Sequence, residues 1–237
     1  MESIETYRNN GYIYGKLEDY SELIDLNEFR KIKEYIDNTN FIRHSRYDYW
    51  YKYNEQSYME ELVYDNYLKN DKDLDTADYV YDKAHQYQLK KIEESGFYPT
   101  WVFGTCGDNE IIGKIHNEVL SEFQKNFVKK YYPEKTFNKF NPTTKLQFYN
   151  KGCEIKLHDD GQPENRICVF LYFLNDSWEK ENGGNLILHD LNGNDITVNP
   201  IFPNFVVLDS YKNLFHEVEK VKKNIKYNIV SFYAYEN

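Results

Sequence analysis

The stretch KLHDDG, residues 156–161, places His158 and Asp160 in an otherwise apolar, strand-rich half of the chain. In a β-strand, residues two positions apart project to the same face of the sheet. His158 and Asp160 therefore point the same way if a strand runs through them, while Asp159 points the opposite way. Two interpretations are open at this stage: a polar turn, or two of the three protein ligands of a metal site.

A third candidate ligand is His216, which opens a later β-rich stretch in NLFHEVEKV. Two imidazoles and one carboxylate form the facial triad of non-haem Fe(II) oxygenases, which leaves open positions on the metal. Lys226 opens the last predicted strand, KYNIVSFYAY. In an apolar barrel this lysine needs an anionic partner, which the far carboxylate of a dicarboxylate cosubstrate would supply. The alternative is an exposed lysine in the cluster KVKKNIK.

The C-terminal part of the chain, from about Pro142, alternates short β-rich runs with turn signals. Strands of this length and spacing are typical of a sandwich or small barrel. The run ICVFLYFL (167–174) is apolar in both alternations and predicts a central strand that is covered on both faces. The predicted strands are TKLQFYN, RICVFLYFLN, GGNLILHD, NDITVNP, NFVVLDS and KYNIVSFYAY.

Residues 1–140 are predicted to be mainly helical. The first helix follows Asp25, a plausible N-cap, and carries Leu26, Phe29, Ile32 and Ile36 on one face. Further helices are predicted over 76–95 and from near Asp108 to before Pro133, with a strand over 97–104. Because no glycine- or serine-rich linker separates the halves, we expect one catalytic domain, 1–237, in which region 1–140 braces a β core formed by 141–237.

Composition narrows the functional classes. Acidic residues outnumber basic ones, 39 to 29, and the net charge of −10 argues against a nucleic-acid partner. The 3 cysteines are odd in number and widely spaced, which disfavours a disulfide framework or structural zinc site and favours a reducing, cytoplasmic setting. The start of the sequence lacks the apolar core of a signal peptide, and no apolar run is long enough to predict a membrane span.

Residues from about 146 to 234 resemble the catalytic half of the 2-oxoglutarate- and Fe(II)-dependent oxygenases of the prolyl hydroxylase type. Tyr149 and Gly152 precede His158 as in the Y-x-x-G lead-in to H-x-D of that family. Arg166 begins a strand that ends in YFLNDSW, similar to the family pattern R…YLN…W. The stretches GGNLIL and FVVLDSYKNLFHEV resemble its double-glycine strand and the strand that leads to its second histidine.

The sequence HDD, the tryptophan before the double glycine and PNFVV are most similar to the branch of ribosomal-protein prolyl hydroxylases. That branch carries a second, degenerate β-helix domain, for which this chain has no room. Many relatives carry a tyrosine where this chain has Ile155, and some carry one where it has Phe173.

The resemblance implies an α+β fold with a mainly β core, a double-stranded β-helix (jelly roll) braced by N-terminal helices. It implies His158, Asp160 and His216 as Fe(II) ligands and Lys226 as the anchor for 2-oxoglutarate. Tyr149 would line the cosubstrate pocket, although it could equally be a core residue. Asn228, where relatives often carry serine, is a further candidate for cosubstrate binding. The other implied cosubstrate is O2, with ascorbate as an optional reductant.

The implied activity is a dioxygenase that hydroxylates an aliphatic C–H, with release of succinate and CO2. A peptidyl prolyl residue is the leading candidate substrate. The same chemistry on a free amino acid or small metabolite is the first alternative, and a non-catalytic metal-binding β-barrel module is the second. We therefore expect a peptide, protein or small-molecule partner, no membrane partner, and leave the oligomeric state open.

Overall fold

The computed structural model describes residues 4–38, 104–106, 120–134, 139–140, 143–149, 151–160, 165–224 and 226–236. The helical elements are α1 (Ile4–Asn10), η1 (Leu17–Tyr20), α2 (Leu26–Asn38), α7 (Ser121–Tyr131) and η3 (Lys180–Asn182). The strands before the jelly roll are β1 (Tyr12–Lys16), β2 (Gly104–Cys106) and β3 (Lys139–Phe140). The jelly-roll strands are β4 (Thr143–Tyr149), β5 (Ile155–His158), β6 (Arg166–Phe173), β7 (Leu186–His189), β8 (Asp195–Val198), β9 (Asn204–Asp209), β10 (His216–Val218) and β11 (Lys226–Glu236).

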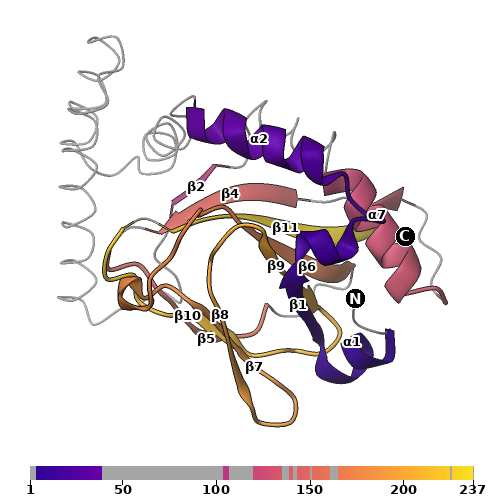
Figure 1. Cartoon of the computed structure of the whole chain (residues 1–237). Coiled ribbons are helices and arrows are strands. Elements are labelled where there is room, and N and C mark those ends of the chain that lie inside the picture. The colour runs from indigo at the N-terminus through magenta and orange to yellow at the C-terminus, as the bar shows by residue number, and fades with distance from the viewer. Residues whose placement is uncertain are drawn as a thin grey trace, which may run out of the picture.

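The strands form two facing sheets (Figure 1). The major, 7-stranded sheet has the order β1-β9-β6-β11-β4-β2, with β3 paired to β11. The minor, 4-stranded sheet has the order β5-β10-β7-β8. From β4 onward the chain passes back and forth between the sheets, and all pairs are antiparallel. This winding is the double-stranded β-helix that the sequence predicted.

Strand β6 is central, as its two-sided apolar pattern predicted. It lies between β9 and β11, and its side chains alternate between two cores. Phe170 and Tyr172 pack into the core on the helix side, while Val169 and Phe173 belong to the core between the sheets. An apolar run that is covered on both faces is the pattern expected of such a strand.

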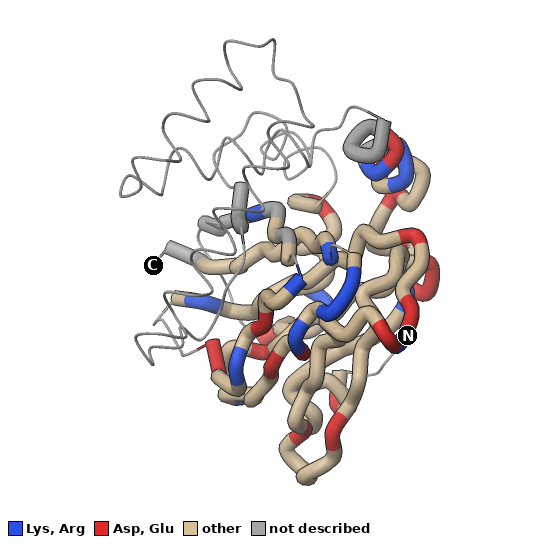
Figure 2. Tube along the Cα trace, turned by 90° about the vertical axis from the view of Figure 1, so that its left-hand side faces the viewer, with Lys and Arg blue, Asp and Glu red and all other residues tan. Residues whose placement is uncertain are grey.

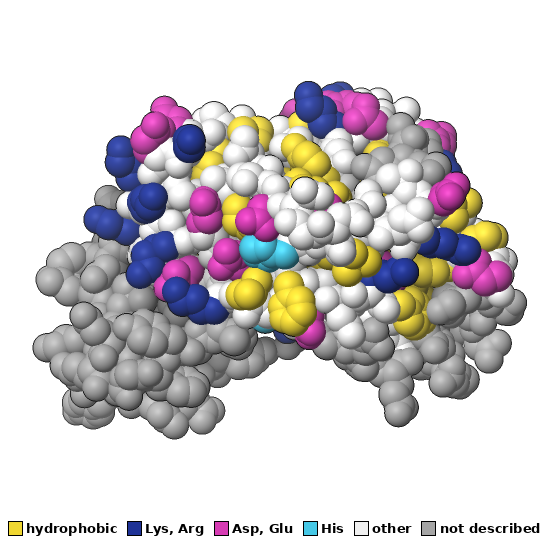
Figure 3. Space-filling model, turned by 90° about the horizontal axis from the view of Figure 1, so that it is seen from below, with side chains coloured by type: hydrophobic (Ala, Val, Ile, Leu, Met, Phe, Trp, Pro, Cys, Tyr) yellow, Lys and Arg dark blue, Asp and Glu magenta, His cyan; other side chains and the backbone are white. Residues whose placement is uncertain are grey.

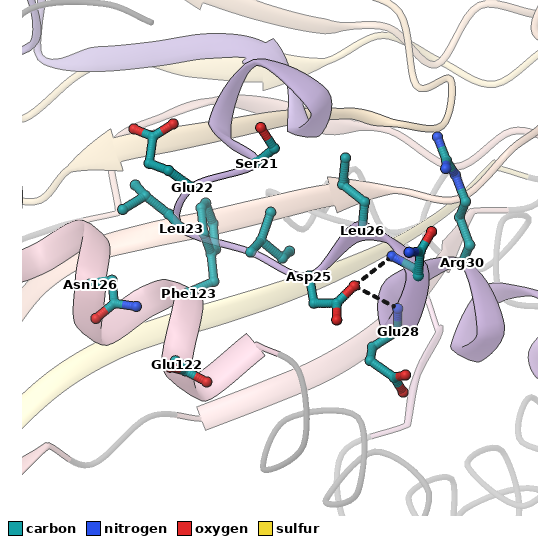
Figure 4. Close-up of a pocket in the computed structure, with 12 residues that line it drawn as sticks. Ser21, Glu22, Leu23, Asp25, Leu26, Glu28, Arg30, Glu122, Phe123 and Asn126 are labelled. Carbon is teal, nitrogen blue, oxygen red and sulfur yellow. Dashed lines mark hydrogen bonds between the residues drawn. The ribbon is translucent and has the colours of Figure 1, made fainter.

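Helices α2 and α7 cover the outer face of the major sheet (Figure 1). Phe123 of α7 makes edge contacts with Phe170 and Phe205, and Phe29 of α2 packs on Tyr172. The N-cap predicted for α2 is confirmed, because Asp25 Oδ1 accepts the backbone N–H of Asn27 and of Glu28 at 2.9 and 3.3 Å (Figure 4).

The first sheet strand, β1, was missed by the sequence analysis, which predicted helices in this region. The pattern of β1 does not alternate cleanly, because Tyr12 and Ile13 are both buried. β1 becomes a strand by pairing with β9, in register from Tyr12 opposite Leu208 to Lys16 opposite Asn204. Long-range pairing of this kind leaves little trace in local periodicity.

The described residues contain only part of the other elements that the sequence predicted. The helix predicted to end before Pro133 is present as α7, with Phe123 and Phe127 buried, and its predicted start lies outside the described residues. The helix over 76–95 and most of the strand over 97–104 also lie outside them. Within the described residues, the helices are too short or too polar to cross a bilayer.

Candidate metal and cosubstrate site

The three predicted metal ligands come together at one end of the minor sheet. His158 ends β5, His216 opens β10, and the two residues are paired in register. Asp160 lies between them, with its oxygens 3.9 Å from His158 Nε2 and 3.8 Å from His216 Nε2. The candidate ligand atoms all lie within 4.8 Å of one another. Two imidazole nitrogens and a carboxylate oxygen at this spacing fit a facial site for Fe(II).

A β-bulge in β5 orients the first histidine. Along β10, two steps separate His216 from Val218, but their partners His158 and Ile155 are three steps apart, so the register shifts between them. The extra residue allows Ile155 and His158 both to face the cavity between the sheets. Asp160 follows the end of β5, so strand alternation, on which the sequence argument relied, does not explain its direction.

Each histidine ring is held by its second nitrogen. His158 Nδ1 lies 2.8 Å from Lys156 O, and His216 Nδ1 lies 3.0 Å from Leu214 O. A backbone carbonyl accepts only from a protonated nitrogen, so Nδ1 carries the proton and Nε2 keeps its lone pair toward Asp160.

The candidate carboxylate ligand, Asp160, is held through its own backbone. Arg166 Nη1 donates to the Asp160 carbonyl oxygen at 2.8 Å, and the guanidinium lies over the Phe232 ring, 4.6 Å from its centroid. The arginine at the start of β6 thus anchors the segment that carries the acidic ligand.

Burial keeps the second histidine neutral. The pKa of His216 is lowered, chiefly by desolvation, which outweighs the attraction of Asp160 that raises it; the neighbouring His158 lowers it further. A neutral imidazole is the form that binds a metal ion.

Lys226, the predicted anchor, is buried rather than part of the exposed lysine cluster. Its side chain is 1% exposed, and no carboxylate pairs with it among the described residues. The ammonium lies 4.4 Å from the Tyr149 ring centroid and 5.7 Å from that of Phe173. Burial lowers the pKa of Lys226 to about 7. A buried ammonium that lies over aromatic rings can be stabilised by an anionic ligand.

The double glycine before β7 allows the loop that precedes Lys226 to pack closely. Gly183 has φ +64°, and a Cβ there would collide with the backbone carbonyl of Lys220. At Gly184, with φ +70°, a Cβ would lie 2.9 Å from Val221 Cγ2. Glycine is required at both positions because of the positive φ and the close backbone approach.

One cavity of about 300 Å³ connects the three metal-ligand candidates to Lys226. Tyr149 also lines this cavity, with its ring fully buried and the pKa of its hydroxyl raised by burial. Apolar walls surround these groups and are formed by Ile155, Val169, Leu171, Phe173, Leu186, Val218, Val230 and Phe232.

Two polar residues near Lys226 have positions that the sequence analysis did not predict. Asn228 is buried, but it is not among the side chains that line the cavity; its Nδ2 donates to Gln147 Oε1 at 2.7 Å. Gln147 does line the cavity, and the sequence analysis missed it. Its position two residues before Tyr149 on the same strand was the available signal, because such residues share a face.

His189, which the H-D sequence could suggest as a ligand, lies elsewhere. Its Nδ1 is 2.7 Å from Asp195, and its Nε2 is 3.7 Å from Glu217. This histidine belongs to the β7–β8 hairpin, which lies at the lower end of the molecule in Figure 2.

A jelly roll that holds two histidines and one carboxylate beside a cavity with a buried cation defines the class of non-haem Fe(II) oxygenases. In agreement, residues 144–234 match the family model described as the 2OG-Fe(II) oxygenase superfamily. The match covers less than half of the chain, and together with the three candidate ligands it supports an oxygenase that uses Fe(II), 2-oxoglutarate and O2.

Solved structures match parts of this chain, and the first of them shares its fold. A prolyl-4-hydroxylase from Pseudomonas putida matches with a TM-score of 0.50 at 15% identity, over 65% of this chain and 85% of that one. A prolyl hydroxylase from Trichoplax adhaerens has a TM-score of 0.48 at 20% identity, over 56% of this chain and 62% of that one. The viral collagen prolyl hydroxylase of Paramecium bursaria Chlorella virus-1 has a TM-score of 0.43 at 17% identity, over 66% and 91%. No curated protein matches in sequence.

Proposed function

We propose that this oxygenase hydroxylates an aliphatic C–H of a peptide substrate, with a prolyl residue as the first candidate. In this proposal His158, Asp160 and His216 hold Fe(II), and Lys226 pairs with the far carboxylate of 2-oxoglutarate. The observation that carries the proposal is the single cavity that joins the three ligand candidates to a buried lysine lacking an acidic partner among the described residues.

When bound, Fe(II) and 2-oxoglutarate supply the oxidative chemistry, in which O2 converts C–H to C–OH while 2-oxoglutarate becomes succinate and CO2. The protein contributes geometry. The carbonyls of Lys156 and Leu214 fix the two imidazole rings, and Arg166 fixes the backbone of Asp160. Ligands held this way need little rearrangement when the metal binds.

The walls of the cavity contribute the environment. Val169 and Val230 from the major sheet and Leu186 and Val218 from the minor sheet exclude water from the space between the metal ligands and Lys226. In a low-dielectric space the attraction between an ammonium and a carboxylate is strong. Lys226 therefore sets the direction in which a dicarboxylate lies, with its other end toward His158 and His216.

Exposed apolar side chains next in sequence to the two histidine ligand candidates favour a peptide over a small polar metabolite. Leu157 and Phe215 directly precede the two histidines and are 53% and 49% exposed. Hydrophobic, acidic and histidine side chains gather in the centre of the molecular face seen in Figure 3. Exposed apolar groups are suited to packing against a polypeptide segment. The name of the Pseudomonas putida relative, prolyl-4-hydroxylase, makes proline the first residue to test.

The first experiment is an anaerobic titration of Fe(II) and 2-oxoglutarate, which follows the weak visible charge-transfer band of the chelate. We expect a band in the wild type, no band in His216→Ala, and a band in Lys226→Ala only at much higher 2-oxoglutarate. A wild type that binds iron but shows no band would contradict the proposed cosubstrate site.

The second experiment addresses the substrate. Proline-containing peptides are compared with matched peptides that carry alanine instead, and with free proline. The expected result is succinate formation together with a one-oxygen mass increase of the proline peptides. Succinate that depends on free proline instead would assign the activity to a small molecule.

A further inference from the structure

A second polar pair lies next to Lys226 and Tyr149 and has no part in the function described so far. In the pairing of β4 with β11, Lys226 is opposite Tyr149 and Asn228 is opposite Gln147. Residues directly opposite in an antiparallel pair share a face, and so do residues two apart on one strand. The four side chains therefore form a square on the cavity face of the major sheet, and Gln147 is 7% exposed.

Hydrogen bonds within this square fix the orientation of the Gln147 amide. The Tyr149 hydroxyl donates to Gln147 Oε1 at 3.2 Å, and Asn228 Nδ2 donates to the same oxygen at 2.7 Å. A carboxamide oxygen has two acceptor sites, so both are filled. The Nε2 group, with its two N–H donors, must then point away from Asn228 and Tyr149.

The Nε2 group of Gln147 has no acceptor among the described residues, although the side chain lines the same cavity as Lys226. An amide N–H that faces a cavity can donate to a ligand bound there, and a charged acceptor forms the stronger hydrogen bond. The cavity beside Gln147 and Lys226 therefore presents an amide donor and an ammonium on adjacent positions of two paired strands.

We propose that Gln147 determines specificity for the dicarboxylate cosubstrate: its Nε2 donates to the carboxylate that pairs with Lys226, and Asn228 acts as a positioning residue that holds the amide in this orientation. This inference rests on the proposed function, since it assumes that 2-oxoglutarate lies with its far carboxylate at Lys226. In this inference Gln147 contacts the cosubstrate carboxylate directly, whereas Asn228 acts only by orienting the Gln147 amide.

The test compares 2-oxoglutarate with 2-oxopentanoate, which has the same carbon chain without the far carboxylate. Binding of each is measured anaerobically to the Fe(II)-loaded protein by the charge-transfer band. In Gln147→Leu, which keeps the approximate volume and removes the donor, we expect 2-oxoglutarate to bind roughly 10- to 100-fold more weakly. The affinity for 2-oxopentanoate stays as in the wild type, because that ligand makes no contact with the amide.

Asn228→Asp is the second variant. An aspartate at this position accepts from Gln147 Nε2 and turns the amide oxygen toward the cavity, where it faces the ligand carboxylate. We expect a loss of 2-oxoglutarate affinity at least as large as in Gln147→Leu, again with 2-oxopentanoate unchanged. Should one variant fail to fold, as judged by thermal unfolding and Fe(II) affinity, the other still decides the question.

Two results would overturn the inference: wild-type affinity for 2-oxoglutarate in both variants, or an equal loss for both ketoacids, which indicates general damage to the cavity. Failure of the proposed function looks different. In that case the iron-loaded wild type itself binds no 2-oxoglutarate.

Discussion

On its helix side the major sheet presents rings and aliphatic chains to α2 and α7, whereas on its cavity side the same strands present amides and an ammonium. Along β11, Ile229 and Tyr233 face the helices, while Lys226, Asn228 and Val230 lie on the opposite side of the sheet, where Lys226 and Val230 line the cavity. Both faces are buried. The difference is that the cavity side carries the ammonium of Lys226, which pairs with no carboxylate among the described residues, whereas unpartnered amide oxygens occur on both sides, at Asn228 Oδ1 and at Gln124 Oε1.

That difference separates stability from function. Burying a polar group without a partner destabilises the fold, whereas burying an aromatic ring stabilises it. The Phe123, Phe127 and Phe170 cluster on the helix side therefore contributes free energy of folding. The buried ammonium of Lys226 on the cavity side is explained by the anion that the proposed function places beside it. The following predictions test this division, from the largest expected effect to the smallest.

Removing a cavity-side metal ligand should abolish function. In His158→Ala, Fe(II) binding and succinate formation fall to background, because two protein ligands cannot hold the metal in a facial site. His189→Ala is the matched control, since His189 also ends a strand of the minor sheet but pairs with Asp195 outside the triad. Iron content after desalting and succinate yield are the measurements. Equal loss in both variants would argue against the assigned triad.

Removing a helix-side ring should cost stability and spare binding. Phe123→Ala is expected to lower the free energy of unfolding by about 3–5 kcal/mol, the usual range for a buried phenylalanine. Below the unfolding transition, the affinity for Fe(II) and 2-oxoglutarate should match that of the wild type. Chemical denaturation measures the free energy of unfolding, and the anaerobic titration measures the affinity for Fe(II) and 2-oxoglutarate. A large loss of affinity in the folded variant would show that the two faces are coupled.

Lys226 should make the ligand-free protein more stable as the pH rises from about 7 toward 10. Burial lowers its folded pKa to about 7. The unfolded chain keeps the lysine proton up to a pKa of about 10.4, so between these values the unfolded state binds more protons and stability increases with pH. The quantity to compare is the pH slope of the unfolding free energy in the wild type and in Lys226→Met. The slope difference should vanish if the lysine titrates normally in the folded protein.

The smallest effect is expected at the helix cap. Asp25→Ala removes the acceptor for the first N–H groups of α2 and should lower the free energy of unfolding by about 1 kcal/mol. Asp25→Ser, which can still accept these bonds, is the control and should recover most of the loss. Cosubstrate affinity should not change in either variant. A change there would mean that α2 influences the cavity across the sheet.

The sequence alone predicted much of the site, because its signals are local. Strand alternation and turn residues indicated the jelly-roll strands, and the types of residue at His158, Asp160 and His216 indicated a metal site. Position at the start of the last strand indicated Lys226. Each of these inferences depends on the identity of a residue and of its near neighbours, which a sequence displays directly.

Only the tertiary structure decided features that depend on register. The bulge opposite His216, the pairing of β1 with β9, and the position of Gln147 opposite Asn228 each follow from how one strand aligns with another. Shifting a strand by one residue exchanges its two faces, and no local pattern specifies that alignment. The sequence therefore indicates which residues of the candidate site can carry out chemistry. The direction in which their polar groups point is set by long-range pairing between strands.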